Sequence, residues 1–251
     1  MERKMERYVR VDFEKKTKRL PVCFCIDISG SMDFYDKKFG WTNVENSEQV
    51  FVDGEWANIA ENGTTYMQEV QDGLELFYQA IKEDDFAYDV CESAIVTFND
   101  TPTKIEDFSF IKDKQAPNLI DLPQGDTYIY EALEMCLDML KDRKLYYKEN
   151  RIPPPYTPWL VIFSDGKAND DETRIQKIQE KLMDLQDRGK LIVYTMAIKE
   201  EKEFLEQLSG YSTRKPILCN KVDTIKKFFE FMSRSVSSSA SGAMFNEEFN
   251  G

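Results

Sequence analysis

Short, unbroken apolar runs recur along this chain, and polar sequence with turn-forming residues follows most of them. The first run covers residues 20–26 (LPVCFCI) and leads into Asp27-Ile28-Ser29-Gly30. Similar runs stand at residues 93–98, 159–163, 191–198 and 216–219. Such runs are typical of buried strands. Because a strand that is apolar throughout must be covered on both faces, they predict a parallel sheet between two layers of helices.

Stretches with helical periodicity fill the gaps between these runs. Apolar residues in steps of three and four are found at Met67, Val70, Leu74, Phe77 and Ile81. Comparable stripes cover residues 129–140, 175–185 and 225–236, with Asp223 as an N-cap before the last. Residues 104–111 would fit an additional edge strand. The alternation predicts an α/β fold with a doubly wound, mostly parallel sheet and helices on both faces, which binds ligands beyond the carboxyl ends of its strands.

The length of 251 residues suits one such domain, which we place at residues 20–236. Residues 1–19 form a charged N-terminal arm, and residues 237–251 are a Ser-rich tail that we expect to be flexible. Residues 33–63 form a long insertion between the first strand and the first helix. Within it, Asp53-Gly54 stands between two extended arms and predicts a hairpin with a type I′ turn.

Composition excludes several classes of function. The formal net charge of −13 argues against nucleic acid as a partner. The absence of histidine excludes Ser/His/Asp and Cys/His catalysis, and the chain has neither a G-x-G-x-x-G motif nor a P-loop for a nucleotide. The apolar runs are too short to span a membrane, and the N-terminus lacks an apolar signal region. We therefore expect a cytoplasmic protein, with its five cysteines reduced.

Oxygen-bearing side chains follow two of the predicted strands and precede one of the predicted helices. The D-x-S-x-S pattern of Asp27, Ser29 and Ser31 directly follows the first strand. Thr127 stands just before the helix expected at residues 129–140, and Asp165 ends the strand at residues 159–163. Each alone is an ordinary turn or helix-cap residue. Together, on the carboxyl edge of one sheet, they form a set of hard oxygen ligands suited to Mg²⁺ or Mn²⁺.

These segments resemble the metal-ion-dependent adhesion site (MIDAS) of von Willebrand factor type A (VWA) domains, which are Rossmann-like. The resemblance covers residues 19–236 and assigns Asp27, Ser29, Ser31, Thr127 and Asp165 as metal ligands. It implies a protein-binding module whose metal holds an Asp or Glu of a partner protein, with Thr127 moving between direct and water-mediated contact. Residues 19–22, 164–167 and 228–237 are most similar to bacterial VWA proteins of tellurium-resistance and stress-response gene clusters.

Two other functions compete with this interpretation. The same cation could serve a metal-dependent phosphatase or nuclease, although Asp27-Ile28-Ser29 lacks the second carboxylate of a phospho-aspartyl enzyme, and we expect no enzyme activity. The domain could also be a structural scaffold with an empty metal site. The insertion at residues 33–63 is acidic, and it offers partner-binding anchors at Phe34, Tyr35, Trp41 and Trp56. It could select a partner, block the metal or be plain surface.

Overall fold

A six-stranded sheet forms the centre of the molecule, in the strand order β5-β4-β1-β6-β7-β8. The computed structural model describes residues 17–33, 49–52, 55–58, 65–164, 168–197, 203–209, 217–218 and 224–240, and all elements and contacts given for this protein lie in these ranges. The strands are β1 (Leu20–Asp27), β4 (Cys91–Phe98), β5 (Pro102–Phe110), β6 (Trp159–Ser164), β7 (Ile192–Ala197) and β8 (Ile217–Leu218). All neighbouring pairs are parallel except β4 and β5, which are antiparallel.

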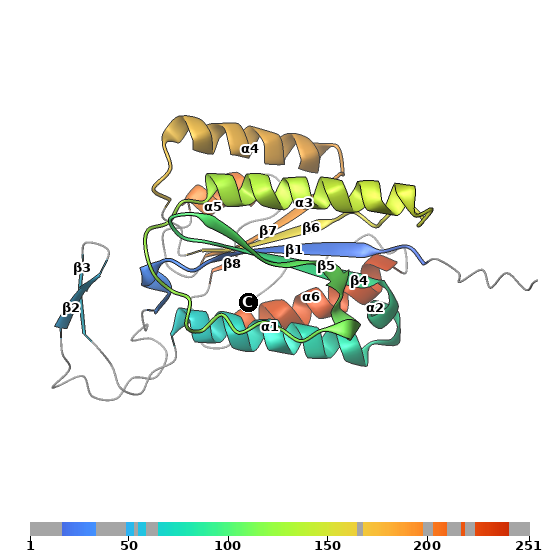
Figure 1. Ribbon diagram of the computed structural model, residues 1–251, viewed down its shortest axis with the longest axis horizontal. Helices are drawn as coiled ribbons and strands as arrows, with labels where there is room; N and C mark the ends of the chain where they lie inside the picture. Colours follow the sequence, from blue (N-terminus) through green and yellow to red (C-terminus); the bar gives the residue numbers. More distant parts are fainter. Residues whose placement is uncertain are drawn as a thin grey trace, which may run out of the picture.

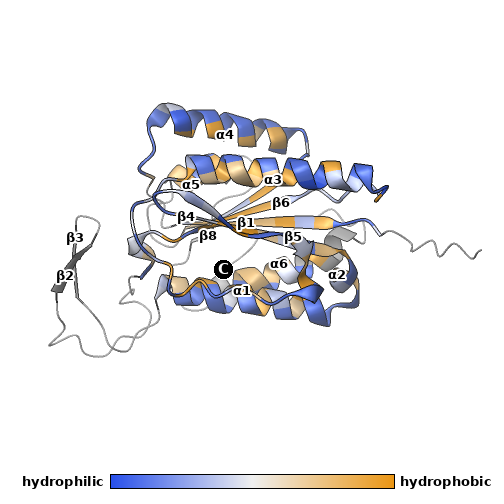
Figure 2. Cartoon of the chain, viewed as in Figure 1, coloured by the Kyte–Doolittle hydropathy of each residue, from blue (hydrophilic) through white to orange (hydrophobic). Residues whose placement is uncertain are grey.

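Helices cover both faces of this sheet (Figure 1). One layer contains α1 (Tyr66–Glu83), α2 (Asp85–Val90) and α6 (Thr224–Ala240), and the other contains α3 (Tyr130–Glu149), α4 (Glu172–Asp187) and α5 (Glu203–Ser209). Side chains alternate along β1, so that Phe24 packs in the core under α1 and α6 while Cys23 packs in the core under α3. Figure 2 shows the apolar sheet between helices whose outer sides are polar. The predicted doubly wound α/β fold is confirmed.

Two less regular parts of the prediction are also confirmed. The strand expected near residues 104–111 is β5, at the edge of the sheet. In the insertion, β2 (Gln49–Val52) and β3 (Glu55–Asn58) pair antiparallel with Val52 opposite Glu55, as expected for a hairpin. The proposed turn residues Asp53 and Gly54 lie outside the described residues.

The boundary of the predicted tail needs correction. Helix α6 continues to Ala240, so residues 237–240 belong to the helix and not to a flexible tail. Serine costs a helix only a few tenths of a kcal/mol relative to better helix formers, and the buried Val236 keeps the last turns packed on the core. The N-cap proposed at Asp223 lies outside the described residues. In the described part of the chain, no helix combines the length and the apolar character needed to cross a membrane.

The four cysteines in the described ranges are buried free thiols, as predicted; they are Cys23, Cys25, Cys91 and Cys136. A hydrogen bond with Cys136, followed by burial, raises the pKa of the Cys23 thiol well above its ordinary value. Burial is the main reason why the pKa values of Cys91 and Cys136 are raised as well. These thiols are therefore protonated and pack as small apolar side chains.

Candidate metal centre

The order of the strands reverses at β1, because the chain passes from β1 to β4 on one side and later to β6 on the other. This is the position where doubly wound sheets bind their ligands. Asp27 ends β1 there and is fully buried. Its Oδ1 accepts a hydrogen bond of 2.8 Å from the Ser29 backbone N–H, and its Oδ2 accepts one of 2.7 Å from the hydroxyl of Ser164, which ends β6. The Asp27 carboxylate thus joins the ends of two neighbouring strands.

The two serines of the D-x-S-x-S pattern lie beside this carboxylate. A single 3₁₀ turn, Gly30–Asp33, follows β1 and is closed by a 3.0 Å hydrogen bond from Met32 N–H to the Ser29 carbonyl. The turn brings the hydroxyl oxygens of Ser29 and Ser31 within 3.1 Å of each other, and both side chains are buried. The spacing of one residue between them therefore places two hydroxyls at one point, as predicted.

Backbone hydrogen bonds hold the loop before α3 against this turn. Gly30 N–H donates to the Gly125 carbonyl over 3.0 Å, and Gln124 N–H donates to the Ile28 carbonyl over 2.9 Å. Gly125 has a φ of +75°, and a Cβ atom at this position would lie 2.4 Å from a carboxylate oxygen of Asp100. A side chain here would be strained at this φ, and it would displace the Asp100 carboxylate that accepts from Asp126 N–H.

Thr127 is fixed by its backbone to the loop that follows β6. Its N–H donates to Asn169 Oδ1 over 3.2 Å, and its carbonyl accepts from Asn169 N–H over 2.7 Å. Only 6% of the residue is exposed, and no hydrogen bond joins its hydroxyl to another described residue, so this hydroxyl is left to solvent or to a ligand. A hydroxyl that is not engaged by the protein is free to serve as an oxygen ligand of a cation.

Thr127 is not the N-cap of the following helix. Helix α3 begins at Tyr130, and the residue at its N-cap position, Ile129, provides no side-chain cap. Asp170 caps the helix instead, from the loop before α4. Its Oδ2 accepts from Ile129 N–H over 2.7 Å, and both of its oxygens lie 3.4 Å from Tyr130 N. The helix-cap interpretation of Thr127 is therefore wrong, and Asp170 is a positioning residue that the sequence pattern missed.

The remaining predicted site residues cannot be placed in the same way. Asp165 directly follows Ser164 but lies outside the described residues, as do Phe34, Tyr35 and Trp41. Trp56 lies in β3, with only its backbone described. Among the described residues, no cluster of three or more His, Cys, Asp and Glu could hold a metal. The described oxygen donors of this centre are one carboxylate and three hydroxyls.

A family model described as the von Willebrand factor type A domain matches residues 22–167. The chain belongs to this VWA family. Inter-alpha-trypsin inhibitor heavy chain H3 of Bos taurus is 29% identical to it over 123 residues, which are 46% of this chain and 13% of that relative. This VWA domain therefore corresponds to a small part of the relative's length.

Solved structures of other proteins share the VWA domain's fold. The PilB minor pilin from Streptococcus sanguinis aligns with a TM-score of 0.58 and 13% identity, over 88% of this chain and 61% of that one. The SpRpn10 VWA domain aligns with a TM-score of 0.51 and 14% identity, over 83% of this chain and 92% of that one. At these identities the likeness concerns the fold alone.

The donor set of this VWA domain fits a hard divalent cation. Carboxylate and hydroxyl oxygens are ligands that Mg²⁺ and Mn²⁺ accept, whereas Zn²⁺ sites are mostly built from nitrogen and sulfur. The residues Asp27, Ser29, Ser31 and Thr127 are brought together by main-chain hydrogen bonds and by the Asp27 carboxylate. The site is therefore assembled by the fold itself.

Proposed function

We propose that this VWA domain is a protein-binding module that uses Mg²⁺ or Mn²⁺ to hold an Asp or Glu of a partner protein. The metal ligands of this metal-ion-dependent adhesion site are Asp27, Ser29, Ser31, Thr127 and Asp165. One observation carries the proposal: the loops after β1 and before α3 are hydrogen-bonded together, and the first of them gathers the Asp27 carboxylate and the hydroxyls of Ser29 and Ser31.

The ligand chemistry explains how such a site would bind an acidic group. When bound, the dication supplies a positive charge that two carboxylates and neutral hydroxyls satisfy incompletely. Asp27 keeps its orientation because both of its oxygens accept hydrogen bonds from the protein. Ser29 and Ser31 present neutral oxygens from one turn. A carboxylate of the partner would complete the ligand set, so binding depends on the metal.

The proposal is one of binding without catalysis. A cytoplasmic location and a role in a bacterial stress-response system are parts of it that rest on the sequence alone. A phosphatase assay with a chromogenic phosphate ester tests the rival enzyme function. Metal-dependent turnover that is lost in Asp27→Ala would favour the enzyme.

Replacement of Thr127 by valine tests the metal site with little change of shape. We expect Mg²⁺ at about a hundred times its Kd to raise the Tm of the wild type by about 5–10 °C. Thr127→Val should lower this response, because it removes one oxygen ligand while the backbone hydrogen bonds of residue 127 remain. Asp27→Ala should abolish the response, measured against the variant's own Tm without metal.

Thr195→Val is the matched control. The Thr195 hydroxyl in β7 is also buried and without a hydrogen-bond partner, but it lies within a strand two positions from β1 in the sheet. Its loss should leave the Mg²⁺ response unchanged. An Mg²⁺ response that is as large in Thr127→Val and Asp27→Ala as in the wild type would contradict the assignment of both ligands.

A further inference from the structure

The C-terminal end of α3 carries an exposed surface that combines basic and apolar side chains. Leu145 and Tyr146 are 50% and 43% exposed, more than any other large hydrophobic side chain among the described residues. Residues 141–151 contain five basic and two acidic side chains, a net charge of +3 in a chain of −13. We define the α3 end surface as Lys141, Lys144, Leu145, Lys148, Glu149 and Arg151, all of which are exposed.

These side chains form two rows along the helix. Lys141, Leu145 and Glu149 are four residues apart and therefore lie above one another on the exposed side. Lys144 and Lys148 form the neighbouring row. None of the six side chains of the α3 end surface makes an ion pair with another described residue. Glu149 is thus an exposed carboxylate beside unpaired positive charges.

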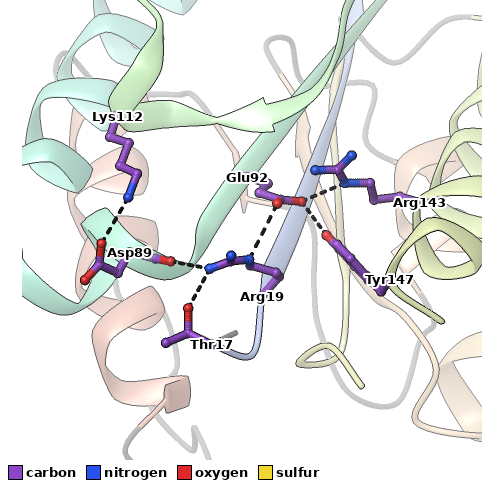
Figure 3. A network of polar contacts seen from close by, with 7 residues as sticks. All are labelled: Thr17, Arg19, Asp89, Glu92, Lys112, Arg143 and Tyr147. Carbon is purple, nitrogen blue, oxygen red and sulfur yellow. Dashed lines mark hydrogen bonds and ion pairs between the residues drawn. The ribbon is translucent and has the colours of Figure 1, made fainter. Parts of the chain in front are cut away.

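A buried network holds this end of the helix rigidly (Figure 3). Glu92, at the start of β4, accepts a 2.8 Å hydrogen bond from Arg143 Nε and another from the Tyr147 hydroxyl. The Arg143 guanidinium in turn stacks on Tyr146, 4.4 Å from the ring centroid. The last two turns of α3 are therefore anchored in the core, and the residues exposed on them are presented in a fixed arrangement.

Arg151 occupies a backbone conformation that normally favours glycine. Its φ is +55°, and it is the only non-glycine residue in the described ranges with a positive φ. The N–H of Ile152 donates to the Tyr147 carbonyl over 2.8 Å and closes the helix end around it. Left-handed backbone is strained for a residue with a side chain, and such strain tends to occur at functional positions.

The opposite end of the domain has the complementary charge. Helix α3 begins beside the metal centre and runs along the sheet to the end where β1 starts (Figure 1). In the loop before α3, which lies against the metal centre, and in the facing turn after β4, the exposed side chains of Asp126 and Asp100 are acidic. At physiological salt, charges farther apart than about 8 Å are largely screened, so local complementarity outweighs the repulsion between two chains of charge −13.

We propose that the partner of the metal centre is a second copy of this chain, bound head to tail. Glu149 of one copy completes the metal site of the next, while Lys144, Lys148 and Arg151 face the acidic rim of that site and Leu145 is buried between the copies. The inference rests on the proposed function. Because the two surfaces differ, the contact is heterologous, and it generates open chains or closed rings.

Molar mass in solution tests this association. Light scattering after gel filtration, from micromolar to near-millimolar protein, should show a mass that rises with concentration in Mg²⁺ and returns to that of the monomer in EDTA. Glu149→Gln removes the carboxylate of the α3 end surface, and Thr127→Val weakens the metal centre. Each variant alone should therefore be mostly monomeric. Their mixture should form dimers that do not grow further. Glu180→Gln, which changes an exposed glutamate on α4, should assemble as the wild type does.

Arg151→Gly separates a docking role from a structural one. Glycine relieves the left-handed strain, so the variant should melt about 2 °C higher, while it loses at least half of the wild-type association. A structural role for Arg151 predicts a lower Tm and unchanged association.

Three outcomes would overturn the proposal. A protein that stays monomeric at all concentrations, although dilute protein shows the Mg²⁺ thermal shift, refutes the second copy as partner and leaves the metal site intact. Association that persists in EDTA or in Glu149→Gln refutes the contact between Glu149 and the metal. If dilute protein shows no Mg²⁺ response, the proposed function itself fails, and head-to-tail binding through the metal fails with it.

Discussion

Replacement of Asp170 by alanine should weaken the first turn of α3 and the metal centre together. The Asp170 carboxylate accepts hydrogen bonds from the N–H groups of Ile129 and Tyr130, at 2.7 and 3.4 Å. No side chain at the N-cap position replaces it. The neighbouring Asn169 holds the backbone of Thr127. Loss of the carboxylate therefore frees the start of α3 and the loop that presents Thr127.

The expected cost follows from these contacts. A hydrogen bond to a charged group contributes about 1.5–3 kcal/mol, and a negative charge at a helix N-terminus contributes about 0.3–1 kcal/mol. Because Asp170 is only half-buried, we take the lower part of both ranges, about 2–3 kcal/mol in total. This corresponds to a Tm about 6–9 °C lower. Asp171 is a matched control, because it caps α4 locally through Arg174 N–H at 3.0 Å. Its removal should cost about 1 kcal/mol.

Urea unfolding and Mg²⁺ titration of the two variants measure both effects. Asp170→Ala should lose at least twice as much stability as Asp171→Ala and should bind Mg²⁺ more weakly at a temperature where both are folded. Asp171→Ala should bind Mg²⁺ as the wild type does. Equal losses of stability, or an unchanged Mg²⁺ affinity in Asp170→Ala, would refute the role given to Asp170.

Three further changes test other parts of the structure. Gly125→Ala should cost about 2–3 kcal/mol in urea unfolding, which is more than Gly189→Ala should cost. Gly189 has a φ of +61°, but nothing lies within 4 Å of its Cβ position, whereas an added Cβ atom on Gly125 would also contact Asp100. Glu92→Gln should cost about 2–3 kcal/mol in the same assay, because it removes the buried charge that pairs with two arginines; a cost near zero would contradict this. Stability should also fall above pH 9, by about 1.4 kcal/mol per pH unit for each buried thiol, because the unfolded chain releases protons that the folded chain keeps. Urea unfolding at pH 8 and pH 10 measures this, and the thiols concerned are those of Cys23, Cys91 and Cys136.

The sequence predicted the main fold because strands that are buried on both faces appear in it as short apolar runs. Every residue of β1, β4 and β6 is buried, so each strand is mostly apolar and stands out from the polar loops. Helices α2 and α5 were missed because they have only 6 and 7 residues. Two turns are too few to establish a period of 3.6 residues.

The candidate metal centre was predicted only in part. Residue types and spacing singled out Asp27, Ser29, Ser31 and Thr127 as candidate ligands, because each follows a strand or precedes a helix, and their role as ligands stays a prediction. The hydrogen bonds that assemble them are mostly made by the main chain. Residue types do not predict which N–H group donates to which carbonyl in such loops. Asp170 was missed because it caps a helix that begins 40 residues earlier in the chain. The acidic Asn169-Asp170-Asp171 stretch before α4 was the one indication available.

The hydrogen bonds around Thr127 limit how the metal centre can change on binding. If Thr127 holds the proposed metal, rotation of its side chain alone would alter that contact without breaking any of the described hydrogen bonds. A larger movement of this loop would separate Thr127 from Asn169 and would pull the start of α3 away from Asp170. Such a movement would cost several kcal/mol, comparable to the whole gain from a cation at a hundred times its Kd. On the proposed function, the local rotation is therefore the rearrangement that metal and partner binding would drive.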